Sequence, residues 1–196
     1  MSARTASEKS RVFSRVLSAW RSSDGVAAIE FAIIVPVFLV IFVGAVDLGR
    51  VLYTAYQLDS AVAAGAEYVA VNPTMVNSTN GATLASAVAT VVENANGSGW
   101  ANNGIVVNNG PSVAVQGGNA TNGGTASNAD QCYCPTGTPP NWSWGTAVTC
   151  GSACPNGGSA GKFVTITASV TYSPLLSTYG LVKNGTLTQS AVAETQ

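Results

Sequence analysis

The feature that most constrains this chain is an apolar run from Val26 to Val46, 21 residues with a single charged one, Glu30. At a helical rise of 1.5 Å per residue such a run is about 30 Å long, which matches the hydrocarbon core of a bilayer. A core helix of a soluble protein seldom stays apolar on all faces over this length. A secretory signal has a shorter apolar region of roughly 7–15 residues and a small-residue cleavage site after it. The run therefore predicts a transmembrane helix, with the lipid bilayer as its partner.

The distribution of charge predicts the direction of insertion. Residues 1–24 carry five basic and two acidic residues, whereas residues 73–196 carry only five charges in all. Because basic flanks remain on the cytoplasmic side of a membrane, we expect residues 1–24 to be cytoplasmic. Everything after about residue 48 is then expected on the other side.

Two residues inside the run are unusual for a membrane helix, Glu30 and Pro36. A carboxylate at membrane depth costs about 2.5–3.5 kcal/mol on insertion scales. Glu30 therefore either lies close enough to the interface to stay hydrated or pairs with a cation, such as an amino terminus created by cleavage just upstream. Proline would break a helix in water but is tolerated in a membrane helix as a kink. We expect a bend near residues 32–36 and no end of the helix there.

The helical pattern continues beyond the run. Apolar residues recur at spacings of three and four as far as Ala70, and Pro73 provides a stop signal. We therefore expect one helix from about residue 27 to 71, whose second half presents an apolar stripe to a small domain. The predicted stripe consists of Leu48, Val51, Leu52, Ala55, Leu58, Val62, Ala66, Val69 and Ala70.

The residues at the start of the run carry a first resemblance. Gly25 is followed by four residues, then by Glu30 and Phe31 and an apolar helix. This arrangement resembles the prepilin-peptidase site of type IV pilins. The resemblance implies that a prepilin peptidase cuts after Gly25, leaving Val26 as the new amino terminus. Glu30 and Phe31 would then act in assembly, with Glu30 setting register by pairing with a mature amino terminus.

A longer stretch, residues 28–70, is similar to the N-terminal module of TadE-like proteins of the tight-adherence pilus system. The similarity rests on Ala28, Glu30, Phe31, Pro36, Asp47, Gly49, Arg50, Gly65, Ala66 and Tyr68. It implies a minor pilin-like subunit, or pseudopilin, whose partners are other pilin-like subunits and the pilus assembly platform. It also implies a bacterial inner-membrane protein with a periplasmic C-terminal domain, with the pilus as a further destination.

The remaining sequence predicts a small α+β domain. Residues 82–95 have helical spacing, and strands are expected at 105–107, 112–116, 162–172 and 186–193. Residues 162–172 alternate polar and apolar side chains, so this strand is expected to be half buried. We expect an antiparallel sheet packed on the long helix. The domain organisation is thus a leader at 1–25, a span at 26–47, a helical continuation at 48–72 and a domain at 73–196.

The segment 117–161 is long for a loop in a compact domain, which is expected of a functional, disordered or crosslinked segment. It contains Cys132, Cys134, Cys150 and Cys154. A zinc site usually has two residues between paired cysteines, and the first pair has one, so two disulfides are favoured outside the membrane. Cys132 and Cys134 are poorly placed to bond each other, and the sequence does not choose between the two crossings. Aromatic residues of this segment either pack against the sulfurs or form an exposed contact; they are Tyr133, Trp142 and Trp144.

Composition excludes several functions. The chain has no histidine and only 9% charged residues, which excludes imidazole-based metal sites and triads and argues against a nucleic-acid binder. Its carboxylates are too sparse for a paired acid–base site, so we expect no enzyme, metal, cofactor or small-molecule substrate. The leading hypothesis is a pilin-like component that works by helix packing. The alternative is a single-pass exported adhesion module that binds a surface through the cysteine-rich loop.

Overall fold

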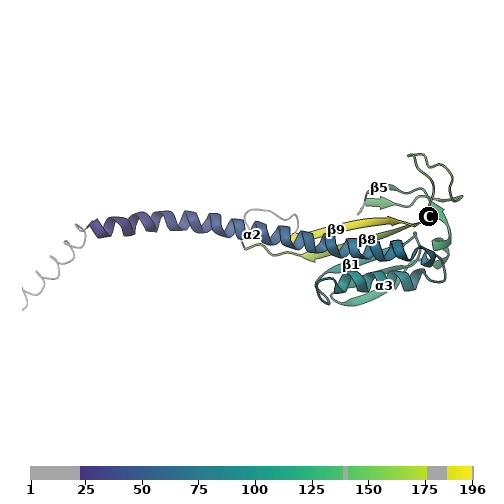
Figure 1. Cartoon of the computed structure of the whole chain (residues 1–196), viewed down its shortest axis with the longest axis horizontal. Coiled ribbons are helices and arrows are strands. Elements are labelled where there is room, and N and C mark those ends of the chain that lie inside the picture. The colour runs from purple at the N-terminus through teal and green to yellow at the C-terminus, as the bar shows by residue number, and fades with distance from the viewer. Residues whose placement is uncertain (1–22, 139–140, 176–184, 196) are drawn as a thin grey trace, which may run out of the picture. The chain divides into compact units, whose positions relative to one another are not determined.

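The computed structural model describes residues 23–138, 141–175 and 185–195, so most of the predicted leader lies outside the described residues. The chain divides into two compact units, Met1–Asp47 and Leu48–Gln196. The long helix α2, Ser23–Val71, belongs to both units and is followed by α3, Gly81–Asn94 (Figure 1). A short 3-10 helix, η1, Pro73–Met75, separates them. The predicted helix of residues 27–71 is confirmed, and it ends two residues before Pro73.

In the first unit the described residues form the beginning of α2. The helix continues through Pro36 without ending, as expected in an apolar environment. Phe38 and Phe42, one turn apart, stack with their ring centroids 6.2 Å apart. Between Val26 and Val71 the helix is long and apolar enough to cross a membrane.

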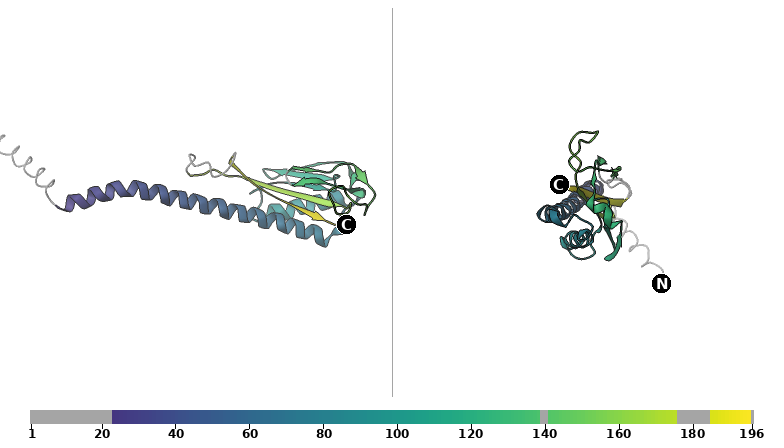
Figure 2. Two further views of the ribbon diagram at one scale, coloured as in Figure 1. Left: turned by 90° about the horizontal axis from the view of Figure 1, so that it is seen from above. Right: turned by 90° about the vertical axis from the view of Figure 1, so that its right-hand side faces the viewer.

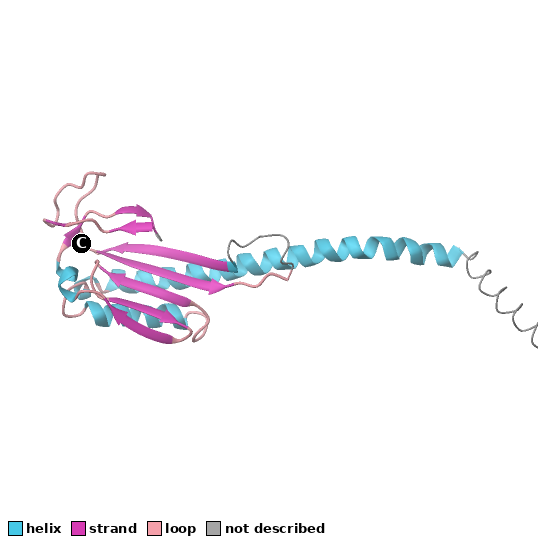
Figure 3. Ribbon diagram, turned by 180° about the vertical axis from the view of Figure 1, so that it is seen from behind, coloured by secondary structure: helices cyan, strands magenta, loops and turns pink. Residues whose placement is uncertain are grey.

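The second unit contains a five-stranded antiparallel sheet in the order β3-β2-β1-β8-β9. The strands of this sheet are β1 Asn102–Val107, β2 Ser112–Gln116, β3 Asn119–Gly123, β8 Phe163–Thr171 and β9 Thr186–Glu194. The second half of α2 and the whole of α3 lie side by side against one face of the sheet, and Figure 3 shows the opposite face (Figures 2 and 3). The predicted α+β architecture is therefore confirmed.

The core lies between the two helices and the sheet. Fully buried side chains from each element meet there, among them Leu58, Leu84, Val92, Ile105 and Ile166. Ile105 and Ile166 face each other across the β1–β8 pair, which places the centre of the sheet under the helices. Burial of such side chains at about 1.5–3 kcal/mol each stabilises this arrangement.

The turn between β1 and β2 also fastens a distant segment to the sheet. Asn108 and Asn109 have φ of 49° and 57°, the left-handed conformation that both central residues of a type I′ turn require, and Gly110 N donates to the carbonyl of Val107 across this turn. The Asn108 side chain is fully buried. Its amide Nδ2 donates to the backbone carbonyls of Ala129 and Gln131 at 3.1 and 2.6 Å, and its Oδ1 accepts from Phe163 N at 3.2 Å.

The expected loop 117–161 contains far more regular structure than its composition indicates. It holds β3 of the main sheet, the 3-10 helix η2, Ala126–Asp130, and two small two-stranded sheets. These sheets pair β4, Cys132–Tyr133, with β7, Ala147–Val148, and β5, Thr136–Thr138, with β6, Asn141–Ser143. Short polar strands such as β3, which is exposed along its whole length, carry no hydrophobic signal.

Two predicted burial patterns need correction. The strand expected to be half buried is buried on both faces at its start, since Phe163 and Thr165 are covered as well as Val164 and Ile166. The apolar stripe of the second half of α2 also begins later than predicted. Leu48 and Leu52 are exposed, at 47% and 51%, and burial in the core becomes complete only at Leu58.

Candidate functional site

The residues predicted to act in processing and assembly all lie near the start of α2. Gly25, Val26, Glu30 and Phe31 are within the helix. Val26 and Phe31 are exposed, at 56% and 70%, and the side chain of Glu30 is exposed as well. In a single chain this segment therefore leaves its carboxylate and its apolar side chains available for contacts with other molecules.

The next turns of α2 expose apolar side chains all around the helix. None of the residues in its most apolar stretch is buried in the fold. Large side chains exposed over these turns are Ile29, Ile33, Ile34, Val37, Phe38, Leu39, Val40, Ile41 and Phe42. A helix that is apolar on every side and unburied needs an apolar surrounding, such as lipid or other apolar helices.

Two residues of the resemblance to TadE-like proteins have packing roles in the second unit. A Cβ atom on Gly65 would lie 2.9 Å from Cγ2 of Val92 on α3, so glycine permits the two helices to approach closely. Arg50 holds its guanidinium carbon 5.7 Å from the ring centroid of Tyr172, just after β8, within reach of a cation–π interaction. Both residues fasten the continuation of α2 to the domain.

The four cysteines form two disulfides, as expected, and the structure selects one of the two possible crossings. Cys132 bonds Cys150, and Cys134 bonds Cys154, across 18 and 20 residues of sequence. The two bridges interleave along the chain, so they enclose overlapping loops. We call residues 132–154 the disulfide module. Tyr133 connects it to the start of β8, with two backbone hydrogen bonds to Gly161 at 2.9 and 3.1 Å.

The aromatic residues of the disulfide module pack against one another and against the sheet. Tyr133, Trp144, Trp142 and Phe163 form a continuous series of edge-to-face contacts with centroid distances of 5.8, 5.9 and 6.0 Å. The Trp142 ring thus covers Phe163 on the sheet face opposite the helices, which explains why β8 is buried on both faces at its start. The packing interpretation of these aromatic residues is the one that the contacts support.

A hydrogen-bonded cluster joins the segment before α3 to η2 and β8. Oδ1 of Asp130 accepts a hydrogen bond from Ser78 N at 2.8 Å. Hydrogen bonds from the side chain and backbone of Ser78, together with the charge of Lys162, hold the pKa of the Asp130 carboxyl below its ordinary value of 3.8. Lys162 donates from Nζ to the carbonyl of Val76 at 3.2 Å. These contacts hold the three segments together.

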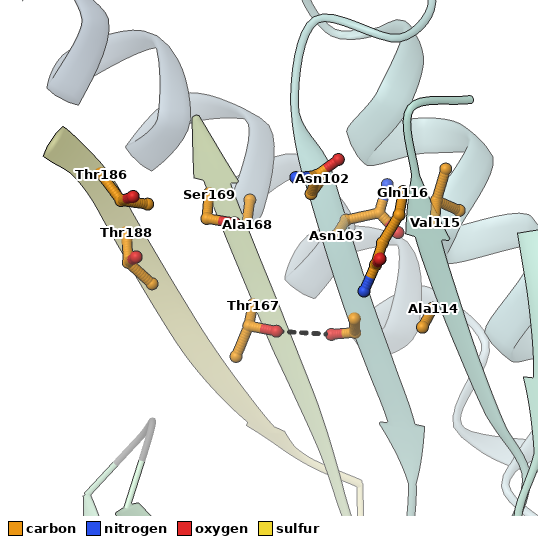
Figure 4. Close-up of a pocket in the computed structure, with 11 residues that line it drawn as sticks. Asn102, Asn103, Ala114, Val115, Gln116, Thr167, Ala168, Ser169, Thr186 and Thr188 are labelled. Carbon is orange, nitrogen blue, oxygen red and sulfur yellow. Dashed lines mark hydrogen bonds between the residues drawn. The ribbon is translucent and has the colours of Figure 1, made fainter. Parts of the chain in front are cut away.

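The uncovered sheet face carries a shallow groove of about 350 Å³ (Figure 4). It crosses β2, β1, β8 and β9, and Thr167 Oγ1 donates to the carbonyl of Gly104 at 3.0 Å in its floor. Its lining residues are Asn102, Asn103, Gly104, Ala114, Val115, Gln116, Thr167, Ala168, Ser169, Thr186 and Thr188. None of them is ionisable, so the groove has no group for acid–base chemistry. In the described ranges no group of three potential metal ligands occurs.

Comparison with known proteins places the informative similarity at the N-terminal end. The family model described as TadE-like protein matches residues 25–67, a stretch that includes Glu30, Arg50 and Gly65. No curated protein and no solved structure matches the chain significantly. The match covers less than a quarter of the chain and shows a likeness to TadE-like proteins in its N-terminal part, where the helix is long and apolar enough to cross a membrane.

Proposed function

We propose that this TadE-like chain is a minor pilin-like component, or pseudopilin, of a tight-adherence (Flp-type) pilus assembly system and acts by helix packing. One observation carries the proposal: α2 exposes apolar side chains on every side from Val26 onward and holds one carboxylate, Glu30, among them. Such a helix suits residence in lipid followed by transfer into a bundle of similar helices, because both environments are apolar.

Processing would supply the cation that Glu30 lacks within the apolar run. Cleavage by a prepilin peptidase between Gly25 and Val26 creates an ammonium group on Val26, four residues before Glu30. Residues four apart lie on the same face of a helix, about 6 Å apart along its axis. The carboxylate can therefore pair with its own amino terminus or with that of a neighbouring subunit. In an apolar surrounding an unpaired carboxylate is costly, so this pair would set the register between subunits.

The proposal also assigns each remaining segment to a side of the membrane. Residues 1–25 form a basic cytoplasmic leader that is removed, and residues 26–47 span the bacterial inner membrane. Residues 48–72 continue the helix beyond the bilayer, and residues 73–196 form a periplasmic domain. Two disulfides support the last assignment, because disulfides persist in the oxidising periplasm. Pro36 would bend the spanning helix.

Processing is tested by the substitution Gly25→Ala in the host cell. The expected product is a precursor that retains the leader, because the peptidase must approach the backbone closely at this position. Intact mass of the protein recovered from membranes would show the leader still attached. A mature mass in the variant would refute cleavage at this site.

The role of Glu30 is tested by Glu30→Gln, which removes the charge and keeps the side-chain size. The variant should remain in the membrane fraction but fail to enter pilus assemblies, because the pair with the new amino terminus is lost. Glu67→Gln is a matched control, since Glu67 is an exposed carboxylate later on the same helix. Normal assembly of the Glu30 variant would refute the register role. Failed assembly of the Glu67 control would also count against it, because loss of any carboxylate on this helix would then block assembly.

A further inference from the structure

The part of α2 that follows the predicted span has two unlike faces. On one face Leu58, Ala61 and Val62 are buried in the core of the second unit. The other exposes an apolar and aromatic surface, which we call the Tyr53/Tyr56 patch. It consists of Leu48, Leu52, Tyr53 and Tyr56, which are 47%, 51%, 65% and 73% exposed. Their spacings of three and four place them together on one side of the helix.

The patch continues the exposed apolar surface of the span and ends where polar residues begin. Val46, the last residue of the apolar run, is exposed, and Leu48 and Leu52 follow it at helical spacing. The next turn beyond Tyr56 presents Asp59 and Ser60, which are exposed. No charged residue belongs to the patch itself.

The distance along the helix places the two tyrosines at the edge of a bilayer. Tyr53 and Tyr56 follow Val46 by seven and ten residues, which is about 10 and 15 Å along the axis. Side chains of a helix lean toward its N-terminus, so both rings lie nearer the span than their Cα atoms do. The headgroup region extends roughly 5–8 Å beyond the hydrocarbon on each side. The Tyr53 ring thus reaches this layer when residues 26–46 fill the hydrocarbon, and the Tyr56 ring lies at its outer edge.

We propose that the Tyr53/Tyr56 patch is a lipid-binding surface that seats in the headgroup layer of the membrane. Leu48 would contact the upper acyl chains, and Leu52 and Tyr53 would lie among the headgroups, where the Tyr53 phenol would donate a hydrogen bond to a phosphate or ester oxygen. The Tyr56 phenol would donate to the outermost headgroup oxygens. Tyrosine suits this layer because its ring is apolar and its hydroxyl is polar. The inference rests on the membrane anchoring in the proposed function. It adds the depth at which the helix is held and the residues that hold it.

Site-directed spin labelling of the full chain in vesicles of phosphatidylethanolamine and phosphatidylglycerol tests this surface. Single cysteines replace Leu39 in the span, Tyr56 in the patch and Ala63 beyond it. Among the described residues the native cysteines are all in disulfides, so a nitroxide reacts only with the introduced thiol. Accessibility to oxygen and to a water-soluble nickel chelate reports the depth of each label.

The expected result is a gradient along the helix: the label at 39 reached mainly by oxygen, that at 63 mainly by nickel, and that at 56 between them. Equal nickel accessibility at 56 and 63 would overturn the proposal, because the patch would then lie in water. Shielding of 56 from both reagents with spin–spin broadening would also overturn it, since a second copy would cover the patch. A nickel-accessible label at 39 would instead refute the membrane span, and with it the proposed function.

A second measurement tests whether the tyrosines hold the helix in place. Gly49 shares their side of the helix, and a Cβ atom there meets nothing within 4 Å, so a label at this position is tolerated. Replacing Tyr53 and Tyr56 together by serine should increase the nickel accessibility of this label, because the interfacial anchor is lost. Replacing both by phenylalanine is the control and should change it less. An unchanged label in the serine variant would overturn the anchoring role.

Discussion

Replacing Gly65 by alanine measures how closely the long helix and α3 are packed. The added Cβ would lie 2.9 Å from Cγ2 of Val92 and 3.3 Å from Cδ1 of Ile166 and Cγ1 of Val88. Val92 and Ile166 are fully buried. A valine side chain has one strongly preferred rotamer in a helix, so it yields little space. Overpacking of this kind typically costs about 1–3 kcal/mol.

Gly49 supplies the matched control because it lies in the same helix, with nothing within 4 Å of an added Cβ. Glycine in the middle of a helix is less favourable than alanine by about 0.5–1 kcal/mol, and both substitutions gain this amount. Gly49→Ala should therefore stabilise the fold by about 0.5–1 kcal/mol. Gly65→Ala should be less stable than Gly49→Ala by about 1–3 kcal/mol, since the helix-propensity gain cancels in the comparison.

Urea denaturation of the full chain in detergent micelles, followed by tryptophan fluorescence, gives the two free energies of unfolding. A double-mutant cycle with Val92→Ala then tests the contact itself. In that background the space beside Gly65 is open, so Gly65→Ala should no longer destabilise. If Gly65→Ala and Gly49→Ala shift the midpoint equally, or if Val92→Ala leaves the cost unchanged, the close approach inferred for the two helices is wrong.

Three further predictions concern the second unit. Asn108→Gly keeps the left-handed backbone but removes the buried amide hydrogen bonds, so it should lower the free energy of unfolding by about 2–4 kcal/mol; Asn109→Gly, at a similar φ, should be nearly neutral in the same urea titration. Joint replacement of Cys134 and Cys154 by serine opens a loop of 20 residues and should lower the free energy of unfolding by about 3 kcal/mol. If reducing the disulfides of the parent protein leaves its free energy of unfolding unchanged, this prediction is wrong. The lowered pKa of Asp130 stabilises the fold above about pH 4, and this contribution is lost as the pH falls through the folded-state pKa. Thermal melts should therefore show a smaller acid-induced loss of Tm for Asp130→Asn than for the parent, and parallel pH curves would contradict this.

The sequence predicted the elements whose side chains repeat with a clear period. The apolar run and the proline at 73 predicted α2 nearly to its end, and the alternation at 162–172 predicted β8. It did not predict β3, whose residues Asn119–Gly123 are all exposed and carry no periodic apolar signal. That strand exists because it pairs with β2, and pairing through backbone groups leaves no signature in side-chain type.

Tertiary contacts decided what the sequence left open. The burial of Phe163 depends on the disulfide module, which lies over it through Trp142. The choice between the two disulfide crossings likewise depends on the pairing of β4 with β7, which opposes Cys132 to Val148, two residues before Cys150. Neither contact follows from local spacing. The processing and assembly residues, in contrast, are proposed from sequence alone, because they form a local motif in one helix.

The position of β8 has a consequence for synthesis of the chain. This strand lies between β1 and β9 in the sheet. Its partner β1 is synthesised some sixty residues earlier, so one edge of β1 has no hydrogen-bonding strand until β8 is made. During this interval the edge of β1 that pairs with β8 is open, and an open strand edge with apolar side chains invites association with other nascent chains. Ribosome-bound fragments that stop before Phe163 should therefore bind chaperones, whereas fragments that extend past Glu194 should no longer bind them.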